Sequence, residues 1–207
     1  MLASGVPLEG CRAAALLFHG RGRTPDEMIE LAARMAVPGM AYLAPTADGN
    51  SWYPYSFLEP LDRNQPALTH ALAAYAALVA DLLERGFEQR RLVLIGFSQG
   101  ACLTAEYAAR HAGRYGGVVL FTGGLIGPPG TRWEYTGAFD GTPIFMGGST
   151  VDAFVPVARM RESAAIFRTM GAQVTEQFYD QDGHVVTDAE IAAARAIIQL
   201  TASAAEA

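Results

Sequence analysis

The run Gly96-Phe97-Ser98-Gln99-Gly100 carries the clearest potential for chemistry in this sequence. It has the pattern Gly-x-Ser-x-Gly, which holds a serine in a sharp turn between a strand and a helix and exposes its hydroxyl group as a nucleophile. The pattern also arises by chance in glycine-rich proteins, so the elements predicted before and after it decide whether it marks a nucleophile. The apolar run 91–95 before it predicts a strand, and the run that starts at Ala101 predicts a helix. We therefore expect Ser98 to attack an ester-type carbonyl.

A serine hydroxyl needs a base, and in this kind of site the chain order is serine, then an acid, then histidine. The sequence has four histidines. Only His184 follows Ser98 and falls in a loop, between the last predicted strand and the last predicted helix, so we expect it to be the base. The other three lie at a predicted helix end, inside a helix, or before the serine: His111, His70 and His19.

Two aspartates between the serine and His184 are candidates for the acid. Asp152 follows the predicted strand 143–147 through a short turn, whereas Asp140 precedes that strand and so lies at the wrong end of the sheet. We expect Asp152 to orient His184 and to stabilise its protonated form. The alternative is that Asp152 only caps a helix that begins near Pro156.

The oxyanion of an acyl-transfer intermediate needs two amide donors. The residue after the nucleophile, Gln99, supplies one, and the loop 19–22 after the first predicted strand supplies the other, with the Arg21 amide as our choice. His19 is expected to stabilise this loop. The side chains of Arg21 and Arg23 either bind an acidic substrate or are simply solvated.

An aromatic segment, 51–58, lies midway along the chain and is a candidate for the wall of an acyl pocket. The residues that we expect to line this pocket are Trp52, Tyr53 and Phe57, with Tyr55 beside them. The alternative is that the loop only packs its own aromatic rings together.

Short apolar runs alternate with amphipathic ones, which predicts a mostly parallel sheet covered by helices on both faces. We expect strands at 13–19, 40–44, 91–96, 117–122, 143–147 and 173–179, and helices at 25–35, 66–85, 99–111, 155–170 and 187–202. Thr24 and Glu27 have the spacing of a capping box for the first helix. Two long segments, 45–65 and 123–141, interrupt the alternation, and such structured loops are usually functional.

Composition narrows the class of protein. All fifteen basic residues are arginines, they are scattered, and the net charge is −6, which argues against nucleic acid as a partner. We expect one domain over 1–207, no secretory signal, apolar runs too short to span a bilayer, and a cytoplasmic location. The two cysteines, Cys11 and Cys102, have no partners at metal-ligand spacing, so neither a metal site nor a disulfide framework is expected.

Together these motifs resemble the carboxylesterase/phospholipase family of α/β-hydrolases, which includes acyl-protein thioesterases, lysophospholipases and relatives of dienelactone hydrolase. The resemblance covers about 13–200 and depends on the runs 19–22, 51–53 and 96–101, together with Asp152 and His184. It implies an α/β-hydrolase fold, an esterase that needs no cofactor, and a short lid region around Trp52. This chain departs from the usual pattern at Arg23, where many members have an aspartate, and at Gly148, where many have a histidine.

We expect hydrolysis of a short or medium acyl ester, a small-molecule substrate, through an acyl-enzyme on Ser98. Two alternatives stay open: a long-chain acyl thioesterase or lysophospholipase, and a non-catalytic binding module that kept the fold. The oligomeric state is also open, and a homodimer is one of the states that fit.

Overall fold

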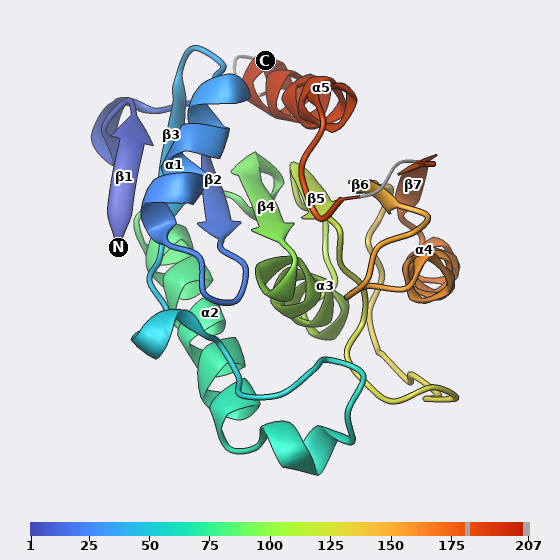
Figure 1. Ribbon diagram of the computed structural model, residues 1–207. Coiled ribbons are helices and arrows are strands. Elements are labelled where there is room, and N and C mark those ends of the chain that lie inside the picture. Colours follow the sequence, from blue (N-terminus) through green and yellow to red (C-terminus); the bar gives the residue numbers. More distant parts are fainter. Residues whose placement is uncertain (181–182, 205–207) are drawn as a thin grey trace.

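The computed structural model describes residues 1–180 and 183–204, and seven strands in this part of the chain form one sheet (Figure 1). The order across the sheet is β1-β3-β2-β4-β5-β6-β7. The strands are β1 (Leu2–Gly5), β2 (Ala13–Phe18), β3 (Met40–Ala44), β4 (Leu92–Phe97), β5 (Gly117–Phe121), β6 (Pro143–Ser149) and β7 (Gln173–Tyr179). This sheet and its helices are those of the α/β-hydrolase fold that the sequence predicted.

Six of these strands run parallel and were expected, and the seventh was not. β1 pairs antiparallel with β3 at the edge of the sheet, with Leu2 opposite Ala44 and Gly5 opposite Ala41. It is short and largely exposed, so it lacks the buried apolar run by which the parallel strands were recognised. The sheet is therefore mixed, with one antiparallel edge strand.

Helices cover both faces of the sheet (Figure 1). α1 (Pro25–Arg34) and α5 (Asp188–Ala204) pack on one face, and α2 (Ala67–Glu84), α3 (Gln99–Arg110) and α4 (Val157–Thr169) on the other. Alternate residues of β2 show the division, because Leu16 and Phe18 join the core under α2, α3 and α4, whereas Ala15 and Leu17 join the core under α1 and α5. Both faces of the central strands are thus buried.

The predicted capping box of α1 is wrong, and a capping box is found at α5 instead. Thr24 makes no side-chain cap hydrogen bond, and Glu27 pairs with Arg23 at 2.8 Å. At α5, the Glu190 carboxylate accepts hydrogen bonds from the Thr187 amide and hydroxyl, both at 2.8 Å, while the Thr187 hydroxyl accepts one from the Glu190 amide at 3.3 Å. In α1 the Glu27 side chain forms an i,i+4 ion pair with Arg23 instead of the hydrogen bond to the Thr24 amide that a capping box requires.

α2 is the one helix in the described part of the chain that is long and apolar enough to cross a membrane, judged by length and composition alone. Thr69, His70, Asp81 and Glu84 interrupt its apolar residues, so the expectation about uninterrupted apolar runs is not contradicted. Core helices of proteins that never enter a membrane pass the same test. In this fold Leu68, Tyr75 and Leu82 of α2 are fully buried, and Tyr75 stacks on Phe18 with ring centroids 3.8 Å apart.

The two long loops contact each other beside the carboxyl ends of the strands. The Gly127 amide donates a hydrogen bond to the Phe57 carbonyl at 2.8 Å. Within the first loop, the buried Asn64 side chain accepts from the Tyr55 amide and donates to the Ser56 carbonyl, both at 2.9 Å. These contacts hold the loop around Phe57 in one conformation over the strand ends.

Candidate active site

Ser98 lies between β4 and α3 in a backbone conformation that few residues adopt, with φ 54° and ψ −118°. The close packing of this turn explains its two glycines. A Cβ on Gly100 would lie 2.1 Å from the Phe18 carbonyl oxygen, and one on Gly96 would lie 2.4 Å from the Gly100 carbonyl oxygen. Since Cβ atoms do not approach backbone that closely, only glycine fits at both positions. The turn presents the Ser98 hydroxyl at the N-terminus of α3.

His184 links the serine to the acid across three separate loops. Its Nε2 lies 2.7 Å from Ser98 Oγ, and its Nδ1 lies 2.6 Å from Asp152 Oδ2. The Asp152 side chain is fully buried, and the His184 side chain is only 20 % exposed. Because a carboxylate accepts from Nδ1–H, Nε2 is left to accept the serine proton. The structure thus brings together Ser98, Asp152 and His184, the three residues that the chain order indicated.

Asp152 also stabilises the turn that carries it. Its Oδ1 accepts hydrogen bonds from the amides of Phe154 and Val155, both at 2.8 Å. α4 begins later, at Val157, with Pro156 at its N-cap position and no side-chain cap. Asp152 therefore closes its own turn rather than capping α4, and its second oxygen is free to orient His184.

Aromatic rings on two sides limit the movement of the His184 ring. Phe97 and Phe154 each lie with their ring centroid 5.1 Å from that of His184. Phe154 is 68 % exposed, so it covers the histidine from the solvent side. On the other flank, the capping box at Thr187 secures the chain three residues after His184.

The loop after β2 passes directly beside the nucleophile. A Cβ on Gly20 would lie 3.2 Å from the Ser98 Cβ, so the backbone of 20–21 runs against the serine. The amides of Arg21 and Gln99 donate to no backbone or side-chain oxygen within the described part of the chain. Two free amides on either side of Ser98 suit the binding of an oxyanion.

His19 stabilises this loop from beneath. Its Nδ1 donates to the Gly20 carbonyl at 2.8 Å, and its Nε2 accepts from the Ala47 amide at 3.1 Å. The ring is fully buried, and burial lowers the pKa of His19, so it stays neutral as these two hydrogen bonds require. His19 is thus a structural residue, as the sequence indicated.

The Gln99 side chain has a role that the sequence did not reveal. Its Oε1 accepts from the Trp52 amide at 3.0 Å, and its Nε2 donates to the Tyr53 carbonyl at 2.7 Å. The residue after the nucleophile therefore ties the aromatic loop to the N-terminus of α3. Buried amide-to-backbone hydrogen bonds of this kind hold a loop in one position.

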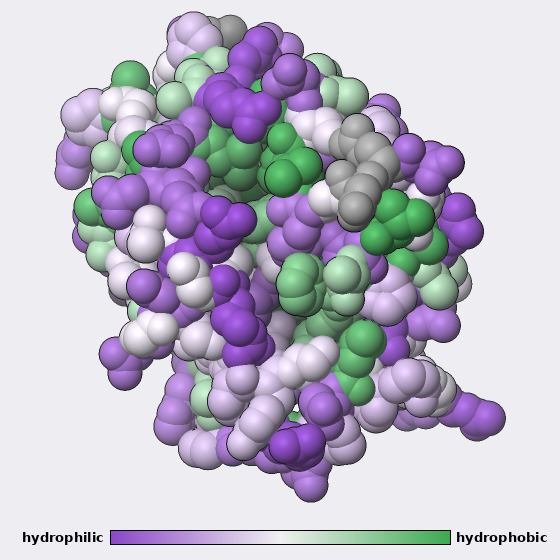
Figure 2. Space-filling model, in the orientation of Figure 1, coloured by the Kyte–Doolittle hydropathy of each residue, from purple (hydrophilic) through white to green (hydrophobic). Residues whose placement is uncertain are grey.

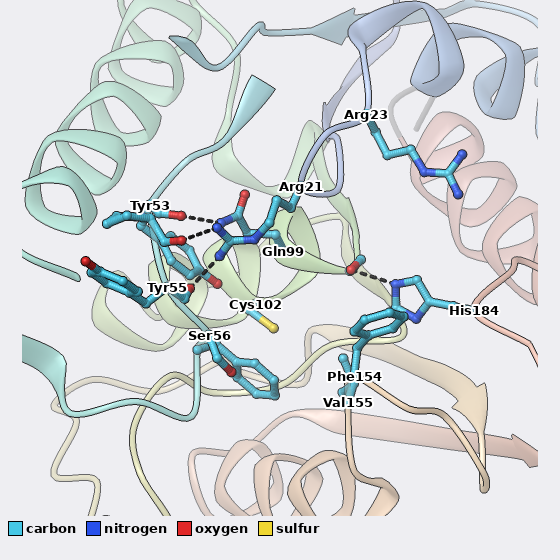
Figure 3. A pocket seen from close by; sticks show the side chains of 13 residues that line it. Arg21, Arg23, Tyr53, Tyr55, Ser56, Gln99, Cys102, Phe154, Val155 and His184 are labelled. Atoms are coloured by element: carbon cyan, nitrogen blue, oxygen red, sulfur yellow. Dashed lines mark hydrogen bonds between the residues drawn. The ribbon is translucent and has the colours of Figure 1, made fainter. Parts of the chain in front are cut away.

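The guanidinium group of Arg21 stabilises the same loop from outside. It donates to the carbonyls of Pro54 and Tyr55, and Figure 3 shows it directed at that backbone. Arg23 pairs instead with Glu27 on α1. Both arginine side chains therefore have partners within the chain, which weakens the idea that they bind an acidic substrate.

A cavity of about 660 Å³ opens over Ser98 and His184. Tyr53 and Phe57 line it, as predicted, and Figure 3 shows the tyrosine on the side of the site away from His184. The sequence did not point to the other apolar members, which come from α3 and from the turn after Asp152: Cys102, Phe154 and Val155. Burial raises the pKa of the Cys102 thiol to about 12, so this thiol is not a nucleophile.

Trp52 does not line the cavity, which corrects the prediction. Its side chain is buried against β2, with its ring centroid 5.1 Å from that of Phe18, and its indole N–H donates to the His19 carbonyl at 2.8 Å. The chain bends at Trp52 and Tyr53, and Tyr53 lines the cavity while Trp52 packs into the core. Within the described residues, no group of three His, Cys, Asp or Glu side chains could hold a metal ion.

A mixed sheet with helices on both faces, and a serine in a strained turn after its central strand, define an α/β-hydrolase. The model of the phospholipase/carboxylesterase family matches residues 7–202, and the chain belongs to this family of serine hydrolases.

Individual relatives agree with this assignment. A solved phospholipase/carboxylesterase from Dyadobacter fermentans DSM 18053 is 41% identical, with a TM-score of 0.91 over 96% of this chain and 95% of that one. Acyl-protein thioesterase 1 of Eremothecium gossypii is 26% identical over 84% of this chain and 81% of its own length. The esterase PE8 is 20% identical, with a TM-score of 0.80 over 96% of both chains, and shows the shared fold.

Proposed function

We propose that this chain hydrolyses esters of short or medium carboxylic acids through an acyl-enzyme on Ser98. The observation that carries the proposal is the continuous hydrogen-bond chain from Ser98 through His184 to the buried Asp152, with distances of 2.7 and 2.6 Å. It lies at the mouth of a cavity with apolar walls, as an ester site requires.

In the first half of the reaction, the Ser98 oxygen attacks the ester carbonyl while its proton passes to His184 Nε2. The carbonyl oxygen becomes an oxyanion, which the free amides of Gln99 and Arg21 stabilise. The Asp152 carboxylate stabilises the imidazolium. When the tetrahedral intermediate collapses, the carbon–oxygen bond to the alcohol breaks and His184 returns the proton to the leaving oxygen.

In the second half, water takes the place of the alcohol. His184 accepts a proton from the water as it attacks the acyl carbonyl, and the same amides stabilise the second oxyanion. Collapse of this intermediate breaks the bond to Ser98 Oγ, returns the proton to the serine, and releases the carboxylic acid.

The cavity supports an acyl group of moderate length. Its volume of about 660 Å³ is within the ~300–1,000 Å³ typical of small-molecule sites. Buried residues, Tyr53 and Cys102, form its inner wall, and the Gln99 hydrogen bonds hold Tyr53 in place. A wall held in this way favours an acyl chain that ends inside the cavity.

Replacement of Ser98 by alanine tests the proposal. We expect hydrolysis of p-nitrophenyl butyrate to fall by roughly 10³-fold or more, because the nucleophile of the acyl-enzyme is lost. Ser203→Ala, which changes an exposed serine of α5, is the matched control and should keep the wild-type rate. A Ser98→Ala variant with the wild-type rate would refute the assignment of the nucleophile.

A second candidate function is long-chain acyl thioester hydrolysis, favoured by the similarity to an acyl-protein thioesterase. A series of p-nitrophenyl esters from two to sixteen carbons separates the two. A maximum at long chains would favour this candidate over the short-ester function.

Labelling by a fluorophosphonate probe addresses the binding-module alternative, since a protein that cannot carry out the reaction would form no adduct on Ser98. A cytoplasmic location and a single domain over 1–207 also stay proposals.

A further inference from the structure

A second, smaller cavity of about 250 Å³ lies beside the candidate active site, between α1 and the segment 184–186. It shares His184 and Arg23 with the larger cavity, so the two cavities adjoin at the catalytic histidine, although Ser98 lines only the larger one. Figure 3 shows Arg23 and His184 on the side of the site away from Tyr53 and Tyr55. The smaller cavity thus lies on the opposite side of the nucleophile from the aromatic loop.

Apolar side chains form the inner surface of this smaller cavity. Met28 and Leu31 of α1 and Phe97 of β4 are buried there, and Val185 covers it from the outside while being 56 % exposed. Figure 2 shows apolar surface, coloured green, in the hollow between α1 and the segment that leads into α5. The inner surface of this cavity, formed by Met28, Leu31 and Phe97, is therefore apolar.

Charged residues surround the apolar floor but are paired with one another. Arg23 pairs with Glu27, and Arg34 pairs with Asp188, each at 2.8 Å. The guanidinium of Arg23 also lies over the Phe97 ring, 5.9 Å from its centroid. Among the described residues, the cavity therefore presents no unpaired cation to an incoming group, which favours a neutral ligand over an anionic one.

The chemistry of the reaction says which part of an ester enters this cavity. His184 must deliver its Nε2 proton to the leaving oxygen, so the alcohol portion lies next to His184 when the carbon–oxygen bond breaks. With the acyl group in the larger cavity, the space open to the alcohol is the one between His184 and α1. We propose that the smaller cavity is the leaving-group subsite and that it selects esters of small, neutral, apolar alcohols. This inference rests on the proposed ester hydrolysis.

The volume limits the alcohol to one ring or a short alkyl chain. At about 250 Å³ the cavity is smaller than the ~300–1,000 Å³ sites that enclose drug-sized ligands. A glycerol-phosphate headgroup is longer and negatively charged, so it fits this small apolar cavity poorly.

A series of acetate esters tests the subsite. Ethyl, butyl and 2-phenylethyl acetate share one acyl group and have alcohols of similar acidity, so differences report on the leaving-group side. We expect kcat/KM to rise about tenfold from ethyl to 2-phenylethyl acetate in the wild type, in line with the modest discrimination that apolar pockets achieve. The ratio of the two values within one variant cancels any general effect on His184.

Val185→Asp should remove this preference by placing a charge at the outer edge of the cavity, above its apolar floor, so the ratio falls to about one. Val151→Asp is the matched control, because Val151 is also exposed, adjoins Asp152, and lies outside both cavities. It should keep the wild-type ratio. Leu31→Ala is a second variant, which enlarges the cavity from α1 and should shift the preference toward larger alcohols.

The outcomes separate this inference from the proposed function. A flat wild-type series, in an enzyme that still hydrolyses p-nitrophenyl acetate, would overturn the subsite and leave the ester hydrolase standing. An equal loss of preference in the Val151 and Val185 variants would also overturn it. Failure to hydrolyse any ester or to react with a fluorophosphonate would overturn the proposed function itself.

Discussion

The Gln99 side chain offers a test of how the aromatic loop is held. Replacing Gln99 with leucine keeps the backbone amide and nearly the volume of the side chain, but it removes the acceptor for the Trp52 amide and the donor for the Tyr53 carbonyl. The glutamine is only 6 % exposed, so water cannot readily take the place of either partner. The loop must then either leave two backbone groups unsatisfied or move outward to reach solvent.

The expected cost follows from the two hydrogen bonds. Each contributes about 0.5–1.5 kcal/mol, and a buried group left without a partner costs about 1–3 kcal/mol. Because outward movement of the loop limits the loss, we expect the free energy of unfolding to fall by about 2–3 kcal/mol. In a chain of this size that corresponds to a decrease in Tm of about 4–12 °C.

Two measurements together check this prediction. Urea denaturation gives the change in the free energy of unfolding, and p-nitrophenyl butyrate kinetics give kcat and KM. We expect KM to rise more than kcat falls, because Tyr53 lines the acyl cavity while the hydrogen bonds of Ser98 and His184 lie elsewhere. Gln199→Leu, an exposed position on α5, is the control and should change neither stability nor KM.

A Gln99→Leu protein with wild-type stability and wild-type KM would refute this role of the Gln99 side chain. Such a result would mean that the loop is held by its other contacts, chiefly the Arg21 guanidinium and Asn64. A fall in kcat alone, with KM and stability unchanged, would point instead to a disturbed Gln99 amide in the oxyanion hole.

Two further predictions concern buried ionisable groups. Burial raises the pKa of Glu190, so its contribution to stability is present below the ordinary glutamate range and is lost as the pH rises through the raised value. The stability of the wild type relative to Glu190→Gln should therefore decrease as the pH rises above the ordinary glutamate range, measured by urea denaturation; an increase would contradict it. Since the pKa of Cys102 is about 12, iodoacetamide at about pH 8 should leave this thiol unlabelled in the native protein and label it in denaturant.

The sequence predicted much of the fold because its signals were local. Apolar runs located the parallel strands, and residues such as Pro25 and Gly86 located helix ends near those observed. It also pointed to the three residues that the structure brings together, since a strand-serine-helix turn combined with chain order leaves few candidates for the acid and the histidine. Ser98 and His184 are 86 residues apart, so only a rule about the fold could relate them.

What the sequence could not predict depends on contacts between distant segments. β1 is a short edge strand whose register with β3 is set by the rest of the sheet. Trp52 and Tyr53 are neighbours of similar character, and only the path of the loop decides which of them packs on Phe18 and which faces the cavity. Phe154 was missed because nothing local distinguishes an aromatic residue that covers the histidine from one that is merely exposed.

Hydrogen bonds attach the aromatic loop to the rest of the protein through the buried Gln99 side chain, the Arg21 guanidinium, the Trp52 indole N–H and the Phe57 carbonyl. Its conformational entropy is therefore lost when the chain folds, not when an ester binds. Acyl-group selection then depends on the shape of a preorganised cavity, and turnover needs no opening of this loop. An insertion in this segment that left these attachments in place would change the shape of the cavity while the loop stayed ordered.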